Sequence, residues 1–441
     1  MKQIDSKPVV TKDIQLATGT EAEALEAEEA PYSRLAGTPV TVRDLSELGR
    51  SLTNQMGSLK RAIHDPRNEK VAPSFNAAQV ARMCGKAPAG FTRLLQSAEK
   101  RKLPTGIVTD DAGKTKSQRT FALKEAVQWV SAVGGKTYKR KPGQPGAVIT
   151  VGFYKGGVGK TLVAASVAQA LAQRGYKTLA IDLDPQGHLS VMLGVELQDV
   201  GVEDTFAPLT AMPHEDYARE SLVESVRPTY WTNLDIVAGG NALHEGEFFL
   251  PLRAMRAQEE KKVFNFLEVL KKGLDFGLRD EYDYIVIDTP PQMGYQVMNA
   301  YWAADAILMP VVPEGLSLQS SVQFWDQFSQ LVDVAQRRST KPKEYAWLGV
   351  VPSKVEHHKP SVQGMLTWMR MFYGEYVLGS ELPLTEAVKN AGTEFNTVYD
   401  ISKYVGSAKT YERARTAFDR LVSEVDMLTR QRLWKEGSKE K

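Results

Sequence analysis

The first regular pattern of hydrophobic positions along the chain is a helical stripe that starts near Thr41. Apolar residues recur there at steps of three and four over about 25 residues, which predicts one apolar face of a long helix. The stripe consists of Leu45, Leu48, Leu52, Met56, Leu59 and Ile63. The residues before it are mostly polar, and Pro66 follows it. We therefore predict a flexible acidic arm over residues 1–40 and a dimerisation helix over residues 41–66, because a helix with such neighbours is suited to pairing with a partner.

Residues 67–133 predict a compact module of helices and strands. Asn76 can cap a helix that ends near Gly85, and a short turn leads to a second helix from about Ala89. The stretch LPTGIVTDDAGKTKSQRTFALKEAVQWV then predicts strand, turn, strand and helix. This order is typical of a winged helix-turn-helix, whose second helix enters the major groove of DNA. The predicted DNA contacts on the second helix and the wing are Thr92, Arg93, Gln96, Lys100, Lys114, Lys116 and Arg119.

The remaining chain predicts an α/β domain behind a linker. Residues 134–146 are rich in glycine, proline and lysine, as linkers are. Beyond them, helical patterns alternate with apolar runs of strand length, namely AVITVGF, KTLAIDLD, LDIVA, YDYIVIDT, AADAILMPVV and EYAWLGVV. Such alternation predicts a mostly parallel, doubly wound sheet with helices on both faces. We assign this domain to residues 147–430 and a polar tail to residues 431–441.

Composition limits the class of protein. The 441 residues, 42% of them apolar, are enough for the cores of two or three domains. The single cysteine, Cys84, excludes a disulfide framework and fits a reducing compartment. The opening MKQIDSKPVV has no apolar core, so we expect no signal peptide, and no run approaches the ~18 apolar residues that span a bilayer. We therefore expect a soluble, cytoplasmic protein that does not contact a membrane.

Charge is spread unevenly along the chain although the net charge is only +2. Residues 1–30 carry about −4, residues 31–145 about +13 and the remainder about −7. A strongly basic block beside a mildly acidic one indicates that the block binds a polyanion such as DNA. The alternative interpretation of the basic block is a solvated surface that binds no polyanion.

The segment YKGGVGKT, between the first apolar strand and a helical pattern, has the features of a phosphate-binding loop. Gly156, Gly157 and Gly159 permit a tight curl, so that backbone N–H groups and the helix N-terminus can surround phosphates. Lys160 would then reach the β- and γ-phosphates, and the Thr161 hydroxyl would bind Mg²⁺. The ordinary loop has glycine where this chain has Tyr154, and this loop carries a further lysine, Lys155, immediately before GGVGKT.

This departure resembles the deviant Walker A ATPases of the ParA/MinD family. KGGVGKT, AIDLDPQGHLS and YIVIDTPP match the family's motifs in order and spacing, and the resemblance covers roughly residues 147–425. It implies that Lys155 reaches across a two-fold interface to the partner's nucleotide, so that ATP holds two subunits together. The nucleotide-binding residues that it implies are Lys155, Gly156, Gly157, Val158, Gly159, Lys160, Thr161, Leu162 and Asp182.

Three aspartates complete the predicted catalytic site, together with Lys155 and Lys160. Asp184 follows the second strand, where its carboxylate can orient the attacking water. Asp182 shares that face of the strand and would help to hold the magnesium shell, although a purely structural role is an alternative. Asp288 ends the YIVID strand and would contact Mg²⁺ through water, unless it only caps a turn.

The resemblance also implies contacts to the base and to DNA. VVPSK and ELPLTEA stand where ParA proteins contact adenine, which makes Ser353, Lys354 and Pro383 candidates. Many relatives bind DNA non-specifically through an arginine after the proline of the second motif, where this chain has Leu384 and Ala387. The basic residues available in its place are Arg370, Lys389, Lys403 and Lys409.

Two further patterns predict no special chemistry. His357 and His358 have no second cluster of histidine or cysteine with them, so we expect no metal site there. Four apolar residues follow at helical spacing and are expected to lie in the core, namely Met365, Trp368, Met369 and Phe372.

The long region before the ATPase resembles ParA proteins of large low-copy plasmids and some secondary chromosomes. That resemblance implies a nucleoid-associated homodimer with weak Mg²⁺-dependent ATPase activity and ATP or ADP as its nucleotide. The ATP-bound dimer would bind DNA non-specifically, a ParB-like centromere-binding partner would stimulate hydrolysis, and the N-terminal domain would repress the partition operon. Two alternatives remain open: a nucleotide-sensing repressor without a segregation role, and a MinD-like positioning ATPase.

Overall fold

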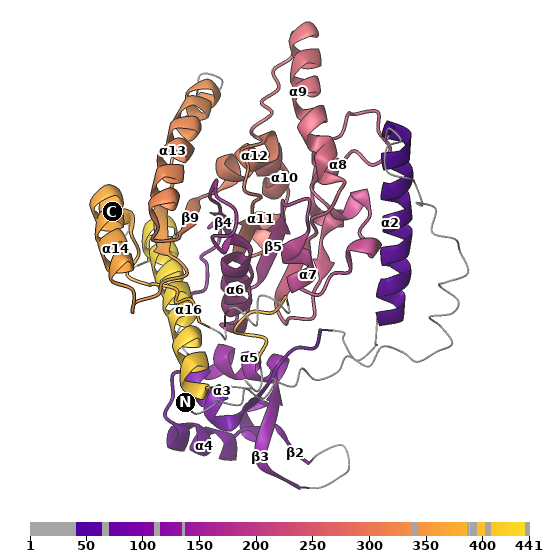
Figure 1. Cartoon of the computed structure of the whole chain (residues 1–441). Helices are drawn as coiled ribbons and strands as arrows, with labels where there is room; N and C mark the ends of the chain where they lie inside the picture. The colour runs from indigo at the N-terminus through magenta and orange to yellow at the C-terminus, as the bar shows by residue number, and fades with distance from the viewer. Residues whose placement is uncertain are drawn as a thin grey trace, which may run out of the picture. The chain divides into compact units, whose positions relative to one another are not determined.

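The computed structural model divides the chain into two units, Met1–Glu69 and Lys70–Lys441 (Figure 1). The structure describes residues 41–63, 70–109, 115–134, 137–336, 342–385, 388, 395–401 and 407–436. The predicted acidic arm, residues 1–40, lies outside the described residues. None of the described helices has both the length and the apolar composition needed to cross a membrane.

The described part of the first unit is one helix, α2 (Val42–Ile63). Its start is stabilised by a reciprocal pair of bonds, because the Asp44 carboxylate accepts from the Thr41 amide at 2.8 Å and the Thr41 hydroxyl accepts from the Asp44 amide at 3.2 Å. The predicted long helix is therefore confirmed. Leu45 and Leu52 of its apolar stripe are 57% and 51% exposed, and pairing through this stripe stays a prediction.

Residues 70–134 form a helical module with a three-stranded antiparallel sheet in the order β1-β3-β2. Its elements are β1 (Ser74–Asn76), α3 (Ala77–Met83), α4 (Pro88–Gln96), β2 (Ile107–Thr109), β3 (Thr115–Ala122) and α5 (Leu123–Trp129). Asn76 caps α3 as predicted, with its side chain accepting from the Gln79 amide at 2.9 Å. The core is aromatic: the Phe91 ring meets those of Trp129 and Phe121 edge-on, with centroids 4.9 and 6.3 Å away.

The α/β domain contains a seven-stranded sheet in the order β10-β9-β4-β8-β5-β7-β6, parallel except for the edge strand β6. Its strands are β4 (Ala147–Val151), β5 (Thr178–Asp182), β6 (Arg227–Pro228), β7 (Leu234–Val237), β8 (Tyr284–Asp288), β9 (Ala306–Val311) and β10 (Trp347–Pro352). Every predicted strand of this domain is confirmed. The two-residue β6 was not predicted, since a proline and so short a run give no strand pattern.

Helices cover both faces of this sheet, as predicted (Figure 1). They are α6 (Lys160–Gln173), α7 (His188–Met192), α8 (Ala207–Thr210), α9 (Leu243–Glu259), α10 (Val269–Asp275), α11 (Leu278–Glu281), α12 (Tyr295–Ala303), α13 (Gly315–Gln336), α14 (Pro360–Tyr373) and α16 (Ala408–Leu428). Alternate strand residues divide between two cores: Ile149 packs with α6 and α16, whereas its neighbour Val148 packs with α10 and α12. The mostly parallel α/β fold is therefore confirmed.

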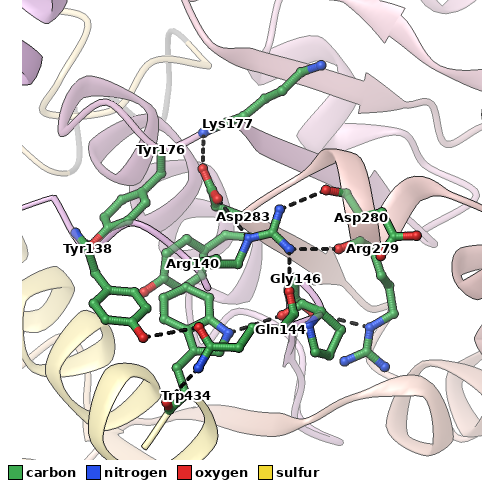
Figure 2. Close-up of polar contacts among 12 residues, drawn as sticks. Tyr138, Arg140, Gln144, Gly146, Tyr176, Lys177, Arg279, Asp280, Asp283 and Trp434 are labelled. Atoms are coloured by element: carbon green, nitrogen blue, oxygen red, sulfur yellow. Dashed lines mark hydrogen bonds and ion pairs between the residues drawn. The ribbon is translucent and has the colours of Figure 1, made fainter. Parts of the chain in front are cut away.

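The segment predicted as a linker, residues 134–146, is tied to the α/β domain where it is described (Figure 2). The Arg140 guanidinium donates to the Asp283 carboxylate at 2.8 Å and to the backbone carbonyls of Gln144, Arg279 and Asp280 at 2.8 to 3.1 Å. Tyr138 stacks on the ring of Trp434, with centroids 5.3 Å apart. Trp434 is buried, although it belongs to the predicted polar tail. The described part of this segment is thus fixed to the α/β domain instead of forming a loose tether.

Helix α14 departs from the expectation that its apolar residues all lie in the core. Met369 is buried, but Trp368 and Phe372 are 46% and 63% exposed, so the prediction is wrong for these two. The helix follows β10, the edge strand of the sheet, and only one of its sides can pack inward.

Candidate active site

The phosphate-binding loop joins the end of β4 to the start of α6. Gly157 and Gly159 have φ of +72° and +93°, a conformation that side chains disfavour, and Gly159 directly precedes the first residue of α6. From the end of β10, the Ser353 hydroxyl donates to the Val158 carbonyl at 2.9 Å. This bond supports the loop, and the predicted contact of Ser353 with adenine stays a prediction. The backbone N–H groups of the loop and of the first turn of α6 are therefore fixed in a form suited to anions.

The first lysine of the site, Lys160, is buried at the start of α6, with only 7% of its surface exposed. Its ammonium donates to the Lys155 carbonyl at 3.1 Å. Burial lowers the pKa of Lys160, while the carboxylates of Asp288 and Asp184 oppose that shift. A buried ammonium group beside the loop amides is suited to binding the phosphates of a nucleotide.

The second lysine, Lys155, is folded back within its own chain. Its ammonium donates to the Ser317 hydroxyl at 2.9 Å and lies 3.5 Å from the Glu314 carboxylate, both near the start of α13. Sequence reasoning missed these two partners, because they stand about 160 residues away in a stretch with no recognisable motif.

Asp182 and Asp288 end neighbouring parallel strands, β5 and β8, and face each other in the register. Asp182 is fully buried, and its carboxylate accepts from the Asp184 amide at 3.1 Å and from the Ser190 amide and hydroxyl at 2.9 and 2.8 Å. Burial raises its pKa to about 6, against the effect of these bonds. The carboxylate of Asp288, equally buried, has no hydrogen-bond partner among the described residues. Burial and the charge of Asp182 raise the pKa of Asp288 well above its usual range.

These two aspartates differ in what they can still bind. No described residue makes a hydrogen bond of normal geometry to the Asp288 carboxylate, but the Thr161 hydroxyl is close enough to act as a donor to it and, with the charge of Lys160, opposes the rise in the pKa of Asp288. A buried, unpartnered carboxylate beside a hydroxyl fits a divalent cation that takes its other ligands from phosphate and water, as Mg²⁺ does. Among the described residues no cluster of three or more histidine, cysteine or acidic side chains could hold a metal alone. Asp182 has its bonds within the protein, which favours the structural alternative for it.

Asp184 lies half-buried in the loop between β5 and α7. Its carboxylate accepts from the Gln186 amide at 2.9 Å, and its charge raises the pKa of Lys160. The structure thus brings Asp184, Lys160 and Asp288 together as predicted.

The remaining residues predicted to bind the nucleotide lie in several parts of the α/β domain. Gly156 and Gly157 are exposed in the loop, Gly159 is half-buried, Val158 is buried and Leu162 is half-buried in α6. Lys354 is exposed with a φ of +53°, and Pro383 is buried and pairs with Val355. Contact between these residues and adenine stays a prediction.

The candidate DNA contacts fall into three groups. Thr92, Arg93 and Gln96 are exposed on α4, and the Thr92 hydroxyl donates to the Pro88 carbonyl at 3.0 Å. Lys100 was predicted on the same helix, but α4 ends at Gln96 because the chain turns inward at the buried Ala98, so this lysine is exposed on the next short turn.

In the predicted wing, Arg119 is exposed and donates to the Thr105 carbonyl at 2.8 Å. Lys114 lies outside the described residues, as does the side chain of Lys116.

In the α/β domain, Arg370 donates to the Glu381 carboxylate at 2.5 Å, which offsets its charge, and Lys409 is exposed. Lys389 and Lys403 lie outside the described residues.

Comparison with known proteins places this fold and site in a family. A family model described as an AAA domain matches residues 146–340. A protein named replication protein A from Rhizobium rhizogenes is 30% identical over 409 residues, which cover 90% of this chain and 97% of that protein. The chromosome partitioning protein ParA of Myxococcus xanthus is 32% identical over 178 residues, 40% of this chain and 56% of that protein. A solved structure named Partition Protein matches with a TM-score of 0.56 at 18% identity, over 87% of this chain and 99% of that one. The chain belongs to the ParA-type family of partition ATPases.

Proposed function

We propose that this protein binds ATP with Mg²⁺ and hydrolyses it slowly to move plasmid or chromosomal DNA. The observation that carries this proposal is the buried Asp288 carboxylate, which has no hydrogen-bond partner of normal geometry in the part of the chain that the structure describes and lies beside a buried Lys160 and a glycine loop that opens a helix. Such a group is costly to bury unless a ligand completes the site, so its presence supports a cation and a polyphosphate as the normal occupants.

Each residue that would hold the nucleotide has a separate proposed role. The loop amides and Lys160 would bind the phosphates, and Thr161 and Asp288 would hold Mg²⁺. The metal would neutralise charge on the β- and γ-phosphate oxygens. Asp184 would orient the attacking water, and Lys160 would stabilise the charge that develops on the transferred phosphoryl group.

Lys155 is proposed to act on the nucleotide of a second copy. In the single chain its ammonium donates to the Ser317 hydroxyl and lies near the Glu314 carboxylate. Lys160 and the loop amides would already bind the phosphates of the nucleotide in its own chain. Formation of an ATP-bound dimer would exchange those two contacts for a phosphate oxygen of the partner.

DNA would be bound in two ways. The exposed polar face of α4, with Arg93 and Gln96, supports operator recognition in the major groove and repression of the partition operon. The ATP-bound dimer would bind DNA of any sequence through basic surface residues, and a ParB-like partner would stimulate hydrolysis and release it.

The test is binding of the full chain to a random-sequence duplex with ATP and Mg²⁺, with ADP, and without nucleotide, followed by fluorescence anisotropy at one fixed salt concentration. Binding that requires ATP, and that Lys155→Gln loses while it keeps most of its affinity for ATP, supports the proposal. Lys271→Gln removes a surface lysine elsewhere and should bind as the wild type does. Binding that is confined to one operator sequence, whatever the nucleotide, would instead identify a repressor without a segregation role.

A further inference from the structure

The loop of residues 183–187, between β5 and α7, holds the proposed water-orienting Asp184. The Asp184 carbonyl accepts from the Gly187 amide and its carboxylate from the Gln186 amide, both at 2.9 Å, so these bonds close a turn without fixing it to the sheet. Two bonds fix the turn: the Leu183 amide donates to the Asp288 carbonyl at 3.1 Å, and the Asp184 amide donates to the Asp182 carboxylate at 3.1 Å. Asp182 is therefore the side chain that anchors the backbone of Asp184 itself.

The anchor itself is oriented by Ser190. One oxygen of Asp182 accepts from the Asp184 amide, and the other accepts from both the amide and the hydroxyl of Ser190. The Ser190 hydroxyl also accepts from the Gly239 amide at 2.9 Å, just beyond the end of β7. Ser190 is fully buried, so it joins three elements with a single side chain.

Gly239 closes this arrangement from the other side. A Cβ atom placed there would lie 2.6 Å from both the Asp182 Cγ and the Asp184 carbonyl oxygen, closer than real contacts allow. The backbone just beyond β7 thus lies against the two aspartates, and any side chain at position 239 would displace them.

We infer that Ser190 is a positioning residue for ATP hydrolysis, which sets the place of Asp184 by orienting Asp182. The inference rests on the proposed ATPase function and assigns Asp182 to the support of the loop. Loss of the hydroxyl would remove one bond to Asp182 and leave the buried Gly239 amide without its acceptor, so that the loop would relax. Because oriented water matters in the hydrolysis step, such a displacement should slow turnover and leave nucleotide binding intact.

The experiment compares wild type, Ser190→Ala and Ser190→Thr by single-turnover ATP hydrolysis and by equilibrium titration with a fluorescent ATP analogue. We expect Ser190→Ala to lower the hydrolysis rate about tenfold with affinity changed less than about twofold, and Ser190→Thr to restore most of the rate. Ser166→Ala is the matched control, since its buried hydroxyl has no partner among the described residues, and it should hydrolyse ATP at the wild-type rate.

A wild-type rate in Ser190→Ala, equal losses of rate and affinity, or failure of Ser190→Thr to restore the rate would overturn the inference. Should Ser190→Ala not fold, as judged by thermal unfolding, Gly239→Ala provides the second test, with slowed hydrolysis at retained affinity as the expected result and wild-type hydrolysis as the contradicting one. A wild-type protein that neither binds nor hydrolyses ATP would refute the proposed function itself, an outcome distinct from all of these.

Discussion

The two ends of the central strands β4 and β8 are built in opposite ways. At their amino ends, Arg140 donates to four acceptors, among them the Asp283 carboxylate next to β8, and Gly146 next to β4 donates to a backbone carbonyl (Figure 2). At the carboxyl end of β8, Asp288 is fully buried with no partner among the described residues. The half-buried charges of Arg140 and Asp283 are thus bonded to each other, whereas the fully buried Asp288 carboxylate has no such partner among the described residues.

The difference indicates where stability and function reside. Bonds completed within the chain stabilise the folded state, whereas an unpartnered buried charge costs free energy until a ligand completes it. We therefore expect changes at the amino ends to alter unfolding more than catalysis, and changes at the carboxyl ends to do the reverse.

The largest effect is expected for Lys160→Ala. The change removes the buried cation closest to the loop amides, so nucleotide affinity should fall more than about a hundredfold, while the unfolding temperature stays near that of wild type. Equilibrium titration with a fluorescent ATP analogue measures the affinity, and calorimetry the unfolding. Wild-type affinity for ATP in this variant would show that the loop is not the phosphate site.

Asp184→Ala should separate binding from turnover. Its carboxylate acts only when water attacks, so the single-turnover rate should fall about a hundredfold or more, while ATP affinity and ATP-dependent DNA binding persist. A loss of affinity as large as the loss of rate would instead mean that Asp184 holds the nucleotide.

Arg140→Ala tests the opposite end of the strands. The change removes the guanidinium bonds to the Asp283 carboxylate, which keeps its bond from the Lys177 amide, and to three backbone carbonyls, and this loss should lower the free energy of unfolding by about 2–4 kcal/mol. Urea denaturation measures the loss. Lys139→Ala, which removes the exposed neighbouring cation, should change it by less than about 0.5 kcal/mol. An ATP affinity that falls while stability is unchanged would contradict the comparison.

Much of this fold follows from sequence pattern. The apolar runs predicted all six parallel strands, and the motifs placed Lys160, Asp184 and Asp288 in one site. Sequence could not distinguish Asp182 from Asp288, since both end apolar strands, and only the fold brings Ser190 and Gly239 to the first of them.

Sequence patterns also misled in two places. The glycine, proline and lysine content of residues 134–146 is typical of a free linker, but Arg140 in this segment bonds to Asp280 and Asp283, which stand some 140 residues away in the sequence. The helical spacing of Trp368 and Phe372 is that of core residues, but spacing does not reveal that their helix follows an edge strand.

Asp288→Asn should stabilise the nucleotide-free protein while it stops hydrolysis. The pKa of Asp288 is raised in the folded state, so the folded protein binds that proton more tightly than the unfolded chain, and the ionised form costs stability at neutral and higher pH. A neutral amide removes that cost. We expect a gain of about 1–2 kcal/mol at pH 8 that shrinks as the pH falls toward the ordinary pKa of an aspartate, because protonation of Asp288 then removes the same cost from the wild type.

The most direct test of the account is therefore the unfolding temperature of wild type and Asp288→Asn at pH 8, alone, with ATP, and with ATP and Mg²⁺. The account predicts that the nucleotide-free variant unfolds at a higher temperature than wild type, and that only wild type gains further stability when Mg²⁺ is added to ATP. A variant that unfolds at a lower temperature than wild type, or that gains as much from Mg²⁺, would contradict the claim that the unpartnered Asp288 is the cation-binding group of an ATP site.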